Sequence, residues 1–422
     1  MPQMLILADD LSGAADCAAA CIGSGLSAYV VLGDPEPGPG SGVLSIDCNT
    51  RHLESEAAAD RVAQLLYHHT VDERFLLFKK LDSALRGSIG AELAAILKVR
   101  RDLSSNEDRV VAVMAPAFPA QGRVTIDGHQ FVHGKLLDAS ETWRHQRSSD
   151  QTHIPSMIAI AGMKPALVGL ELIRSGEDPL REMMKRLSVH TDVLVCDAET
   201  DKDLRLIAEA SRTLGRETVW AGSAGLAYHL PRSMGLASST SSLNLRGFCS
   251  GPTLIVIGSM SEMSREQVTI LGKASNNAVF CIHPKILLEG PRSPHWQQYA
   301  RKLDLTFQVG QDVTVSLEAC QQLGHADGRI LSRALSTLMA PFASRVGALV
   351  ASGGETARSI LEAWGISSLR VVGEFEPGMP LLVTEGWSRA LPVLTKAGAF
   401  GDPETLVRSW KFLSTLDRDA GK

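Results

Sequence analysis

The 422-residue chain lacks most of the short signatures that identify common enzyme classes. It has no C-x-x-C pair, no G-x-G-x-x-G opening a helix, no H-E-x-x-H and no G-x-S-x-G. The segment GHQFVHGKLL has one residue too many for a Walker A loop, and Leu stands where Ser or Thr should follow the lysine. Classical P-loop, nicotinamide-dinucleotide, zinc-protease and serine-hydrolase chemistries are therefore disfavoured.

An excess of positive charge and long apolar runs are also missing. The net charge is −5, which gives no basic footprint for nucleic acid, and no stretch approaches the roughly 20 apolar residues of a membrane span. The N-terminal segment has no basic region before its short apolar run, so no signal peptide is expected. The seven cysteines are odd in number and scattered. We therefore expect a reduced, cytoplasmic protein with neither a membrane nor a nucleic acid as its partner.

Short runs rich in Val, Ile and Leu alternate with helical patterns along almost the whole chain. Several of these runs are continuously hydrophobic, which is typical of parallel strands covered on both faces. The predicted strands of the first half are Met4–Ala8, Ala28–Leu32, Val43–Asp47, Arg74–Lys79, Val110–Ala115, Ala166–Leu170, Val193–Cys196 and Thr218–Ala221. A hairpin with an Asp-Gly turn is predicted over Thr125–Leu137. The pattern predicts an α/β fold with doubly wound, mainly parallel sheets.

The length of the chain favours two domains. Residues 232–252 lose the periodic pattern and are rich in Ser and Gly, as a linker would be. The alternation then restarts, with apolar runs at Thr253–Ser259, Ala278–Ile282, Asp312–Leu317, Gly347–Gly354, Arg370–Glu374 and Leu391–Gly398. We predict an N-terminal domain over residues 1–231 and a C-terminal domain over residues 253–422, with their sheets facing each other across an active-site cleft.

Polar residues follow the predicted strands of the first domain, where ligands gather in open α/β sheets. The first turn places Asp9 and Asp10 side by side. Either Asp10 or Ser12 could cap the helix that follows, which would explain one acid but not Asp9 as well. Acids at such a position commonly bind polyol hydroxyls, hold Mg²⁺ or accept a proton. The third turn presents Arg51, a planar bidentate donor suited to carboxylate or phosphate.

The fourth turn, within FKKLDSALRGSIGAEL, is the densest in charge. It contains Lys79, Lys80, Asp82, Ser83 and Arg86 just before a predicted helix. Cations at a helix N-terminus oppose the helix dipole unless an anion sits there. The turn therefore predicts an anionic ligand.

Three small-residue turns follow strands in the second half of the chain. They contain Gly258 and Ser259, then Gly353 to Thr356, then Gly398 and Gly401. Such turns would expose backbone N–H groups at helix starts, which is one way to cradle phosphates. Acids and cations suited to a hydroxy acid in one domain, with anion-binding turns in the other, suggest phosphoryl transfer.

Six motifs together resemble the four-carbon acid sugar kinase family across nearly the whole chain. They are, in order, ILADDLSGAAD, KKLDSALRGSIGAEL, APAFPAQGR, VIGSMS, ASGGETA and TKAGAFGD. The resemblance implies an acid-sugar-binding N-terminal domain and a nucleotide-binding C-terminal domain. It further implies transfer of the γ-phosphoryl of ATP, with Mg²⁺, to the terminal 4-hydroxyl of a four-carbon sugar acid. It leaves open whether the chain forms a homo-oligomer.

The resemblance also assigns residues by motif. With their neighbours in the same turns, the candidate substrate-binding residues are Asp9, Asp10, Arg51, Lys80, Asp82, Ser83 and Arg86. By hypothesis, Arg51 and Lys80 hold the substrate carboxylate, while Asp10 or Asp82 orients the hydroxyl and accepts its proton. The candidate nucleotide-binding residues are Ser259, Gly353, Gly354, Glu355, Thr356, Gly398 and Gly401. No residue is assigned as a metal ligand.

The fourth turn resembles that of the D-threonate and D-erythronate kinases more than that of the 3-oxo-tetronate kinases. We therefore expect D-threonate or D-erythronate as substrate, with a 3-oxo-tetronate as the alternative. The segment Thr142–Pro155 departs from the acidic, Asp-Pro-containing stretch expected there. A non-catalytic two-domain sugar-acid-binding protein and an acid-sugar dehydrogenase are alternatives from other classes, although the dehydrogenase would lack its dinucleotide fingerprint.

Overall fold

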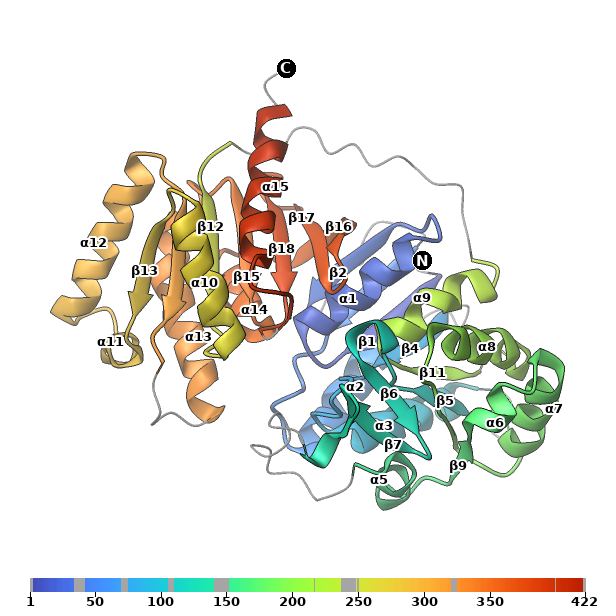
Figure 1. The fold of residues 1–422 in the computed structure, drawn as a ribbon. Helices are drawn as coiled ribbons and strands as arrows, with labels where there is room; N and C mark the ends of the chain where they lie inside the picture. The colour runs from blue at the N-terminus through green and yellow to red at the C-terminus, as the bar shows by residue number, and fades with distance from the viewer. Residues whose placement is uncertain are drawn as a thin grey trace. The chain divides into compact units, whose positions relative to one another are not determined.

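The computed structural model describes residues 3–33, 42–69, 75–104, 110–139, 152–215, 217–236, 248, 250–319, 325–398 and 400–419. The chain divides into two compact units, residues 1–241 and residues 242–422 (Figure 1). Most of the predicted linker at residues 232–252 and most of the segment Thr142–Pro155 lie outside the described residues. Helix α9 (Ala224–Ser233) extends into the first two residues of the predicted linker.

The sheet of the first unit has the strand order β2-β3-β1-β4-β11-β5-β10-β9, and all of these neighbours are parallel. The strands are β1 (Met4–Ala8), β2 (Ala28–Leu32), β3 (Val43–Asp47), β4 (Leu76–Lys80), β5 (Ala112–Ala115), β9 (Pro165–Val168), β10 (Val193–Cys196) and β11 (Val219–Gly222). The chain moves from β1 first to one side of the sheet and then to the other. The prediction of a doubly wound, mainly parallel α/β fold is confirmed.

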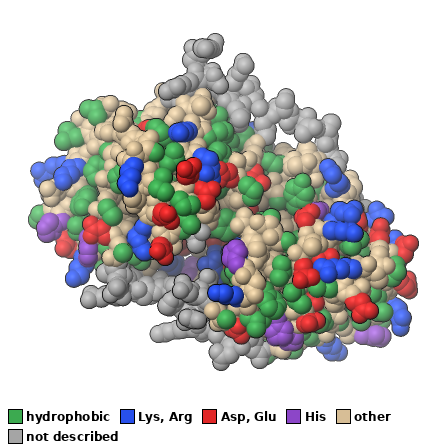
Figure 2. All heavy atoms as spheres, in the orientation of Figure 1, with side chains coloured by type: hydrophobic (Ala, Val, Ile, Leu, Met, Phe, Trp, Pro, Cys, Tyr) green, Lys and Arg blue, Asp and Glu red, His purple; other side chains and the backbone are tan. Residues whose placement is uncertain are grey.

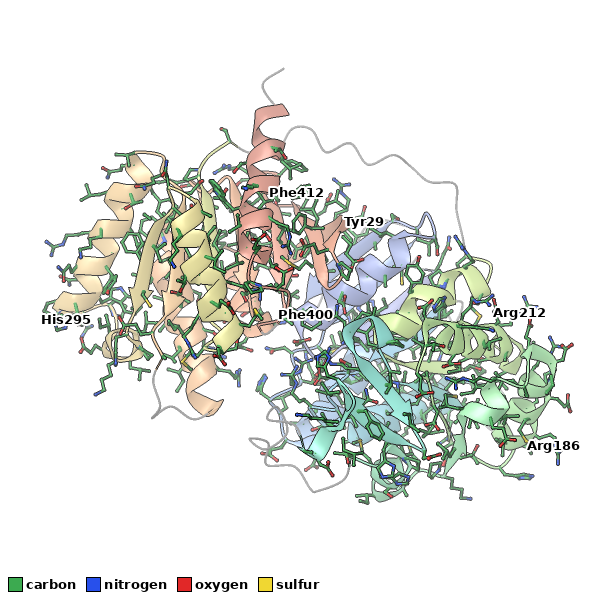
Figure 3. The ribbon with its side chains drawn as sticks, viewed as in Figure 1. Tyr29, Arg186, Arg212, His295, Phe400 and Phe412 are labelled. Atoms are coloured by element: carbon green, nitrogen blue, oxygen red, sulfur yellow. The ribbon has the colours of Figure 1, made fainter. Side chains whose placement is uncertain are left out.

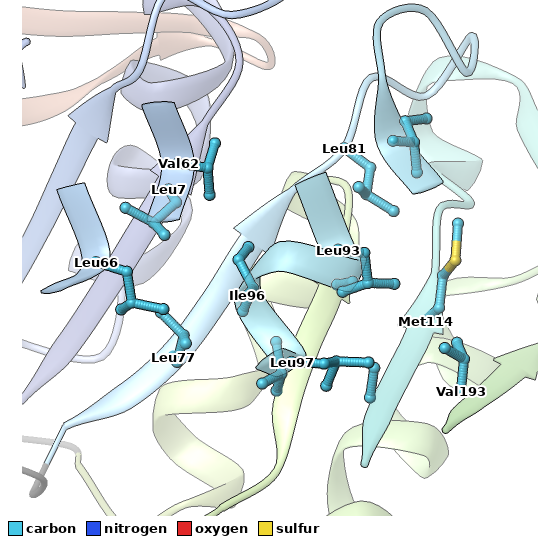
Figure 4. Packing of buried hydrophobic residues seen from close by; sticks show 14 of the residues in the cluster. Leu7, Val62, Leu66, Leu77, Leu81, Leu93, Ile96, Leu97, Met114 and Val193 are labelled. Carbon is cyan, nitrogen blue, oxygen red and sulfur yellow. The ribbon is translucent and has the colours of Figure 1, made fainter. Parts of the chain in front are cut away.

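Helices pack against this sheet in two groups, which explains why its strands are continuously hydrophobic. The first group is α2 (Ser55–His69), α3 (Ile89–Leu103) and α5 (Ile154–Ile160); the second is α1 (Leu11–Ile22), α6 (Leu170–Ile173), α7 (Glu177–Ser188), α8 (Asp201–Ser211) and α9. In the core beneath the first group, Leu7 and Leu77 of the sheet pack with Val62 and Leu66 of α2 (Figure 4). Full burial of each such side chain stabilises the fold by about 1.5–3 kcal/mol.

The predicted hairpin is confirmed as a small separate sheet of β6 (Arg123–Ile126), β7 (His129–Val132) and β8 (Lys135–Leu136). Asp127 and Gly128 turn the chain with φ angles of 49° and 71°, which is typical of a type I′ turn. The buried carboxylate of Asp197 accepts hydrogen bonds from both turn amides, at 2.8 Å and 2.9 Å. Gln130 donates to the carbonyl of Ser83 at 2.9 Å. The hairpin is therefore fixed to the turn that follows β4.

The sheet of the second unit has the strand order β13-β14-β12-β15-β18-β17-β16. Its strands are β12 (Thr253–Ile257), β13 (Ala278–Ile282), β14 (Val313–Leu317), β15 (Ala348–Ser352), β16 (Ser368–Glu376), β17 (Met379–Glu385) and β18 (Pro392–Lys396). The first five strands in this order are parallel, whereas β17 runs antiparallel to both β18 and β16. Strand β17 was not predicted from the sequence, nor was the hairpin that it forms with β16 around Pro377 and Gly378.

Helices α10 (Glu262–Ala274) and α15 (Thr405–Asp419) pack together in the second unit, and α11 (Pro284–Glu289), α12 (Pro294–Gln308), α13 (His325–Met339) and α14 (Gly354–Ala363) form the other group. The ring of Phe412 in α15 lies 4.9 Å from that of Phe375 in β16, centroid to centroid (Figure 3). On the face drawn in Figure 2, Lys and Arg side chains are interspersed with Asp and Glu. None of the helices in the described ranges is long and apolar enough to span a bilayer.

Candidate active site

In the first unit, the turns after β1, β3 and β4 meet at one edge of the sheet, because these three strands are parallel neighbours. Arg51, after β3, joins them. Its guanidinium donates to Asp9 through Nε at 2.6 Å and through Nη2 at 3.0 Å, and to Asp10 through Nη1 at 2.5 Å. Its Nη2 lies 3.9 Å from Oδ1 of Asp82. The structure thus brings four of the predicted substrate-binding residues together.

The two adjacent acids of the first turn have different surroundings. Asp10 is the N-cap of α1: its Oδ1 accepts from the amide of Gly13 at 2.8 Å, and its side chain is 18% exposed. The Asp9 side chain is only 5% exposed and accepts both hydrogen bonds of a bidentate pair with Arg51. Burial alone would raise the pKa of Asp9, but the Arg51 guanidinium and the charges of Lys79 and Lys80 together outweigh burial and lower it. Asp9 is therefore the counter-ion of Arg51, while Asp10 caps the helix and remains partly accessible.

Asp82, after β4, is held by Arg86. The Arg86 guanidinium donates from Nε to Oδ2 at 2.5 Å and from Nη2 to Oδ1 at 3.0 Å. Burial works against ionisation of Asp82, but Arg86 and Arg51 together hold its pKa far below the usual range. The neighbouring Ser83 is half-buried, and its carbonyl is the group that Gln130 of the hairpin contacts.

Lys79 and Lys80 at the end of β4 face opposite sides of the sheet, as successive strand residues do. Lys79 turns toward α3, where its Nζ lies 2.5 Å from Oε2 of Glu92, and both side chains are buried. Burial would lower the pKa of Lys79, but Glu92 raises it. The charge of Lys79 is therefore neutralised inside the unit, so this cation of the turn does not face a ligand.

Lys80 turns to the opposite side, toward the N-terminus of α1. A Cβ at Gly13 would lie 3.0 Å from Nζ of Lys80 and 2.8 Å from Oδ1 of Asp10, so both side chains lie against this glycine. The Lys80 side chain is buried, and among the described residues its ammonium makes no hydrogen bond and no ion pair within 4 Å, although its charge acts on the carboxylates of Asp9 and Asp82. A cation with free N–H donors at a helix N-terminus, beside a partly accessible carboxylate, is suited to a small hydroxy acid.

In the second unit, the three glycine-containing turns follow β12, β15 and β18, which are parallel neighbours. A Cβ at Gly258 would lie 1.9 Å from Oγ1 of Thr356, and a Cβ at Gly398 would lie 2.7 Å from Oγ of Ser259. Glycine is required at both positions because neighbouring turns approach this closely. The side chains of Thr356 and Ser259 fill the space beside the two glycines, so the three turns pack closely at the ends of their strands.

The other predicted nucleotide-binding residues lie on these same turns. Gly353 is the N-cap of α14 and donates its amide to the carbonyl of Lys396 at 2.8 Å. Gly354, Glu355 and Thr356 open α14; Oε1 of Glu355 lies 3.5 Å from Nε of Arg329. Gly401 lies farther along the turn after β18, near the start of α15 and against the Thr405 side chain. All seven predicted residues therefore lie on three adjacent turns.

One residue of this region was missed at the level of sequence. Lys396, the last residue of β18, is 1% exposed, and its Nζ donates to the carbonyls of Ala397 at 3.2 Å, Gly398 at 2.9 Å and Phe400 at 3.0 Å. Burial lowers the pKa of Lys396 to about 8. From sequence, a lysine beside a turn of small residues is expected to be exposed to solvent. Only the fold shows that the side chain of Lys396 points inward.

Comparison with known proteins identifies both halves of the chain. A sugar-binding N-terminal domain family matches residues 4–230, and a nucleotide-binding C-terminal domain family matches residues 254–406. The D-threonate kinase of Cupriavidus necator is 34% identical, over 97% of this chain and 98% of that protein. The 3-oxo-tetronate kinase of the same organism is 26% identical, over 96% and 95%. A crystal structure of a Salmonella typhimurium LT2 protein shares the fold, with a TM-score of 0.77 at 22% identity, covering 97% of this chain and 99% of that one.

The pairing of a sugar-binding half with a nucleotide-binding half defines the class of protein as a two-domain kinase. The chain belongs to the four-carbon acid sugar kinase family, as its full-length likeness to the curated kinases shows. The family resemblance carried by the six motifs is thereby confirmed. A dehydrogenase and a binding protein without catalytic activity, the two alternatives from other classes, do not agree with this membership.

Proposed function

We propose that this kinase transfers the γ-phosphoryl of ATP to the 4-hydroxyl of D-threonate, with D-erythronate as the next candidate. The 34% identity to a D-threonate kinase, against 26% to a 3-oxo-tetronate kinase and 25% to a D-erythronate kinase, supports D-threonate as the first candidate. The motif KKLDSALRG after β4 favours the same choice. The observation that carries the proposal is the Lys80 ammonium, whose N–H donors make no hydrogen bond within the described residues, beside Asp10 at the N-terminus of α1.

Lys80 is the main anchor for the carboxylate of the acid. All three of its N–H donors are available to a ligand, whereas Arg51 already donates three of its five to Asp9 and Asp10. Arg51 contributes its remaining donors and its charge. An anion bound here also satisfies the N-terminal end of the α1 dipole.

Asp10 is the better candidate for orienting the hydroxyl and accepting its proton. Its side chain is more exposed than that of Asp82, whose two oxygens are both held by Arg86. The strongly lowered pKa of Asp82 also makes it a weak proton acceptor. Asp82 with Arg86 instead fixes the turn that carries Lys80 and Ser83. Phosphoryl transfer depends mainly on such positioning of the acceptor.

The turns of the second unit fit the phosphates of a nucleotide. Their closest approaches leave no room for a side chain at Gly258 or Gly398, and the α14 N-terminus lies between them in the sheet order. Mg²⁺, bound with ATP, would neutralise charge on the phosphate oxygens. No residue of this chain is assigned to hold it, because Asp9, Asp10 and Asp82 already accept hydrogen bonds from arginines.

The test is a coupled assay of ADP release with ATP, Mg²⁺ and each of D-threonate, L-threonate, D-erythronate and a 3-oxo-tetronate. We expect D-threonate to give the highest kcat/KM. A higher value with a 3-oxo-tetronate would replace the proposed substrate while keeping the kinase. If none of the four acids were phosphorylated at the expense of ATP, the proposed function as a whole would be contradicted.

A further inference from the structure

The buried ammonium of Lys396 has no role in the mechanism above and no acidic partner. No carboxylate among the residues that the structure describes forms an ion pair with it. Its three hydrogen bonds all go to backbone carbonyls of the turn that follows β18. Burying an unpaired charge is costly, and such groups are retained mainly where function requires them.

Helix α10 captures the same carbonyls from its own side. Ser264 Oγ donates to the carbonyl of Gly398 at 2.8 Å. Gln267 Nε2 donates to the carbonyls of Phe400 at 3.1 Å and Asp402 at 2.8 Å. The carbonyl oxygens of Ala397, Gly398 and Phe400 are therefore directed inward, toward Lys396 and α10.

The direction of the carbonyls fixes the direction of the amides. In a trans peptide the C=O and the following N–H point to opposite sides. Because the carbonyl of Ala397 points at Lys396, the amide of Gly398 points away from it, and Gly398 itself lies against Ser259 of the neighbouring turn. The Gly398 amide makes no hydrogen bond to any residue within the described ranges. A free amide above a buried cation forms an anion-binding surface.

We propose that Lys396 is a positioning residue of the nucleotide site. Its ammonium gathers the carbonyls of the turn after β18, which aims the Gly398 amide at a phosphate and adds positive charge from beneath the turn. The inference rests on the proposed function, in that the second unit must bind ATP. Lysine is specifically suited because three N–H donors around one nitrogen match three converging carbonyls, whereas the planar fork of arginine does not.

The experiment measures ADP binding to the full chain by calorimetry, for the wild type, Lys396→Met and Leu394→Val. Leu394 lies two residues earlier on the same strand and the same face, is buried in the hydrophobic core, and serves as the matched control. We expect Lys396→Met to weaken ADP binding at least tenfold and to raise the KM for ATP, with the KM for D-threonate changed less than twofold. Leu394→Val should lower the melting temperature but leave the Kd for ADP within twofold of the wild-type value.

The outcomes separate the inference from the function on which it rests. Wild-type protein that bound no ADP would remove the nucleotide site and the inference with it. ADP binding by Lys396→Met at wild-type strength would overturn the inference alone, and so would an equal loss of ADP binding in Leu394→Val. If Lys396→Met fails to fold, Ser264→Ala and Gln267→Leu provide a second test, because each removes a hydrogen bond to the same carbonyls. Each of these variants should weaken ADP binding at least threefold. Unchanged affinity for ADP in both would overturn the inference.

Discussion

Replacing Asp9 and Asp10 by asparagine, one at a time, is expected to separate a structural acid from a chemical one. Asp9→Asn keeps the shape of the side chain but removes the charge that compensates Arg51. Breaking a fully buried ion pair costs about 3–5 kcal/mol. Arg51 is 24% exposed and keeps Asp10 as a partner, so we expect a loss of about 2–3 kcal/mol in the stability of the first unit.

Asp10→Asn should have the opposite profile. Asparagine is as good an N-cap as aspartate, so the hydrogen bond from the Gly13 amide is kept. The lost charge on a partly exposed pair costs about 1 kcal/mol or less. If Asp10 accepts the proton of the reacting hydroxyl, however, kcat should fall about 10²–10⁴-fold.

Two measurements check this pair of variants. Urea unfolding, monitored by hydrogen exchange of the amides of β1 and β3, measures the stability of the first unit. The rate of ADP release at saturating D-threonate and ATP measures kcat. The reasoning would be refuted if Asp10→Asn retained near-wild-type kcat, or if it destabilised the first unit as strongly as Asp9→Asn does.

Three further predictions concern packing and pH. Gly258→Ala places a Cβ 1.9 Å from Oγ1 of Thr356, so it should lower the stability of the fold by about 1–3 kcal/mol and raise the KM for ATP. Adding Thr356→Ala removes the clashing atom and should restore part of the lost melting temperature. If the double variant showed no recovery, the clash would be contradicted. The folded state lowers the pKa of Asp82, so the stability that ionised Asp82 contributes is present above its unfolded pKa of about 3.9 and is lost as the pH falls below that value. The urea concentration at the unfolding midpoint should therefore decrease once the pH is below about 4. This decrease should be less steep in Asp82→Asn. Between about pH 8 and pH 10.5, Lys396 binds more protons in the unfolded chain than in the folded chain, because folding lowers its pKa. The free energy of unfolding of the wild type should therefore rise across this pH window by up to about 3 kcal/mol relative to Lys396→Met. If the free energies of the two proteins varied with pH in parallel, the buried charge would be contradicted.

Much of the fold could be predicted because both faces of the sheets are covered. Runs such as Met4–Ala8 and Val193–Cys196 are hydrophobic at every position, and their ends coincide with those of β1 and β10. The missed strand β17 (Met379–Glu385) carries a similar apolar run, and the Pro-Gly turn before it was the available signal. The strand was missed because a βα pattern was expected to continue, and antiparallel hairpins break that pattern.

The site was predictable at the level of turns but not of partners. Adjacent acids and lysines marked turns that the structure brings together, since the ends of parallel neighbours meet at one edge. Lys79 and Lys80 lie on opposite faces of the sheet because successive side chains of a strand alternate, and this alternation can be predicted from the sequence. The partner of Lys79, Glu92 on α3, and the inward direction of Lys396 depend on tertiary packing, which no local pattern encodes.

The most direct test of the account compares D-threonate with threitol, the uncharged polyol of the same length, as phosphoryl acceptors for the wild type and for Lys80→Met. If Lys80 anchors the carboxylate, the loss of a charge-assisted hydrogen bond worth about 1.5–3 kcal/mol should raise the KM for D-threonate roughly 10–150-fold. The KM for ATP should stay unchanged, and the preference for the acid over threitol should largely disappear. An unchanged KM for D-threonate, or a preference for the acid that survives in Lys80→Met, would contradict the account.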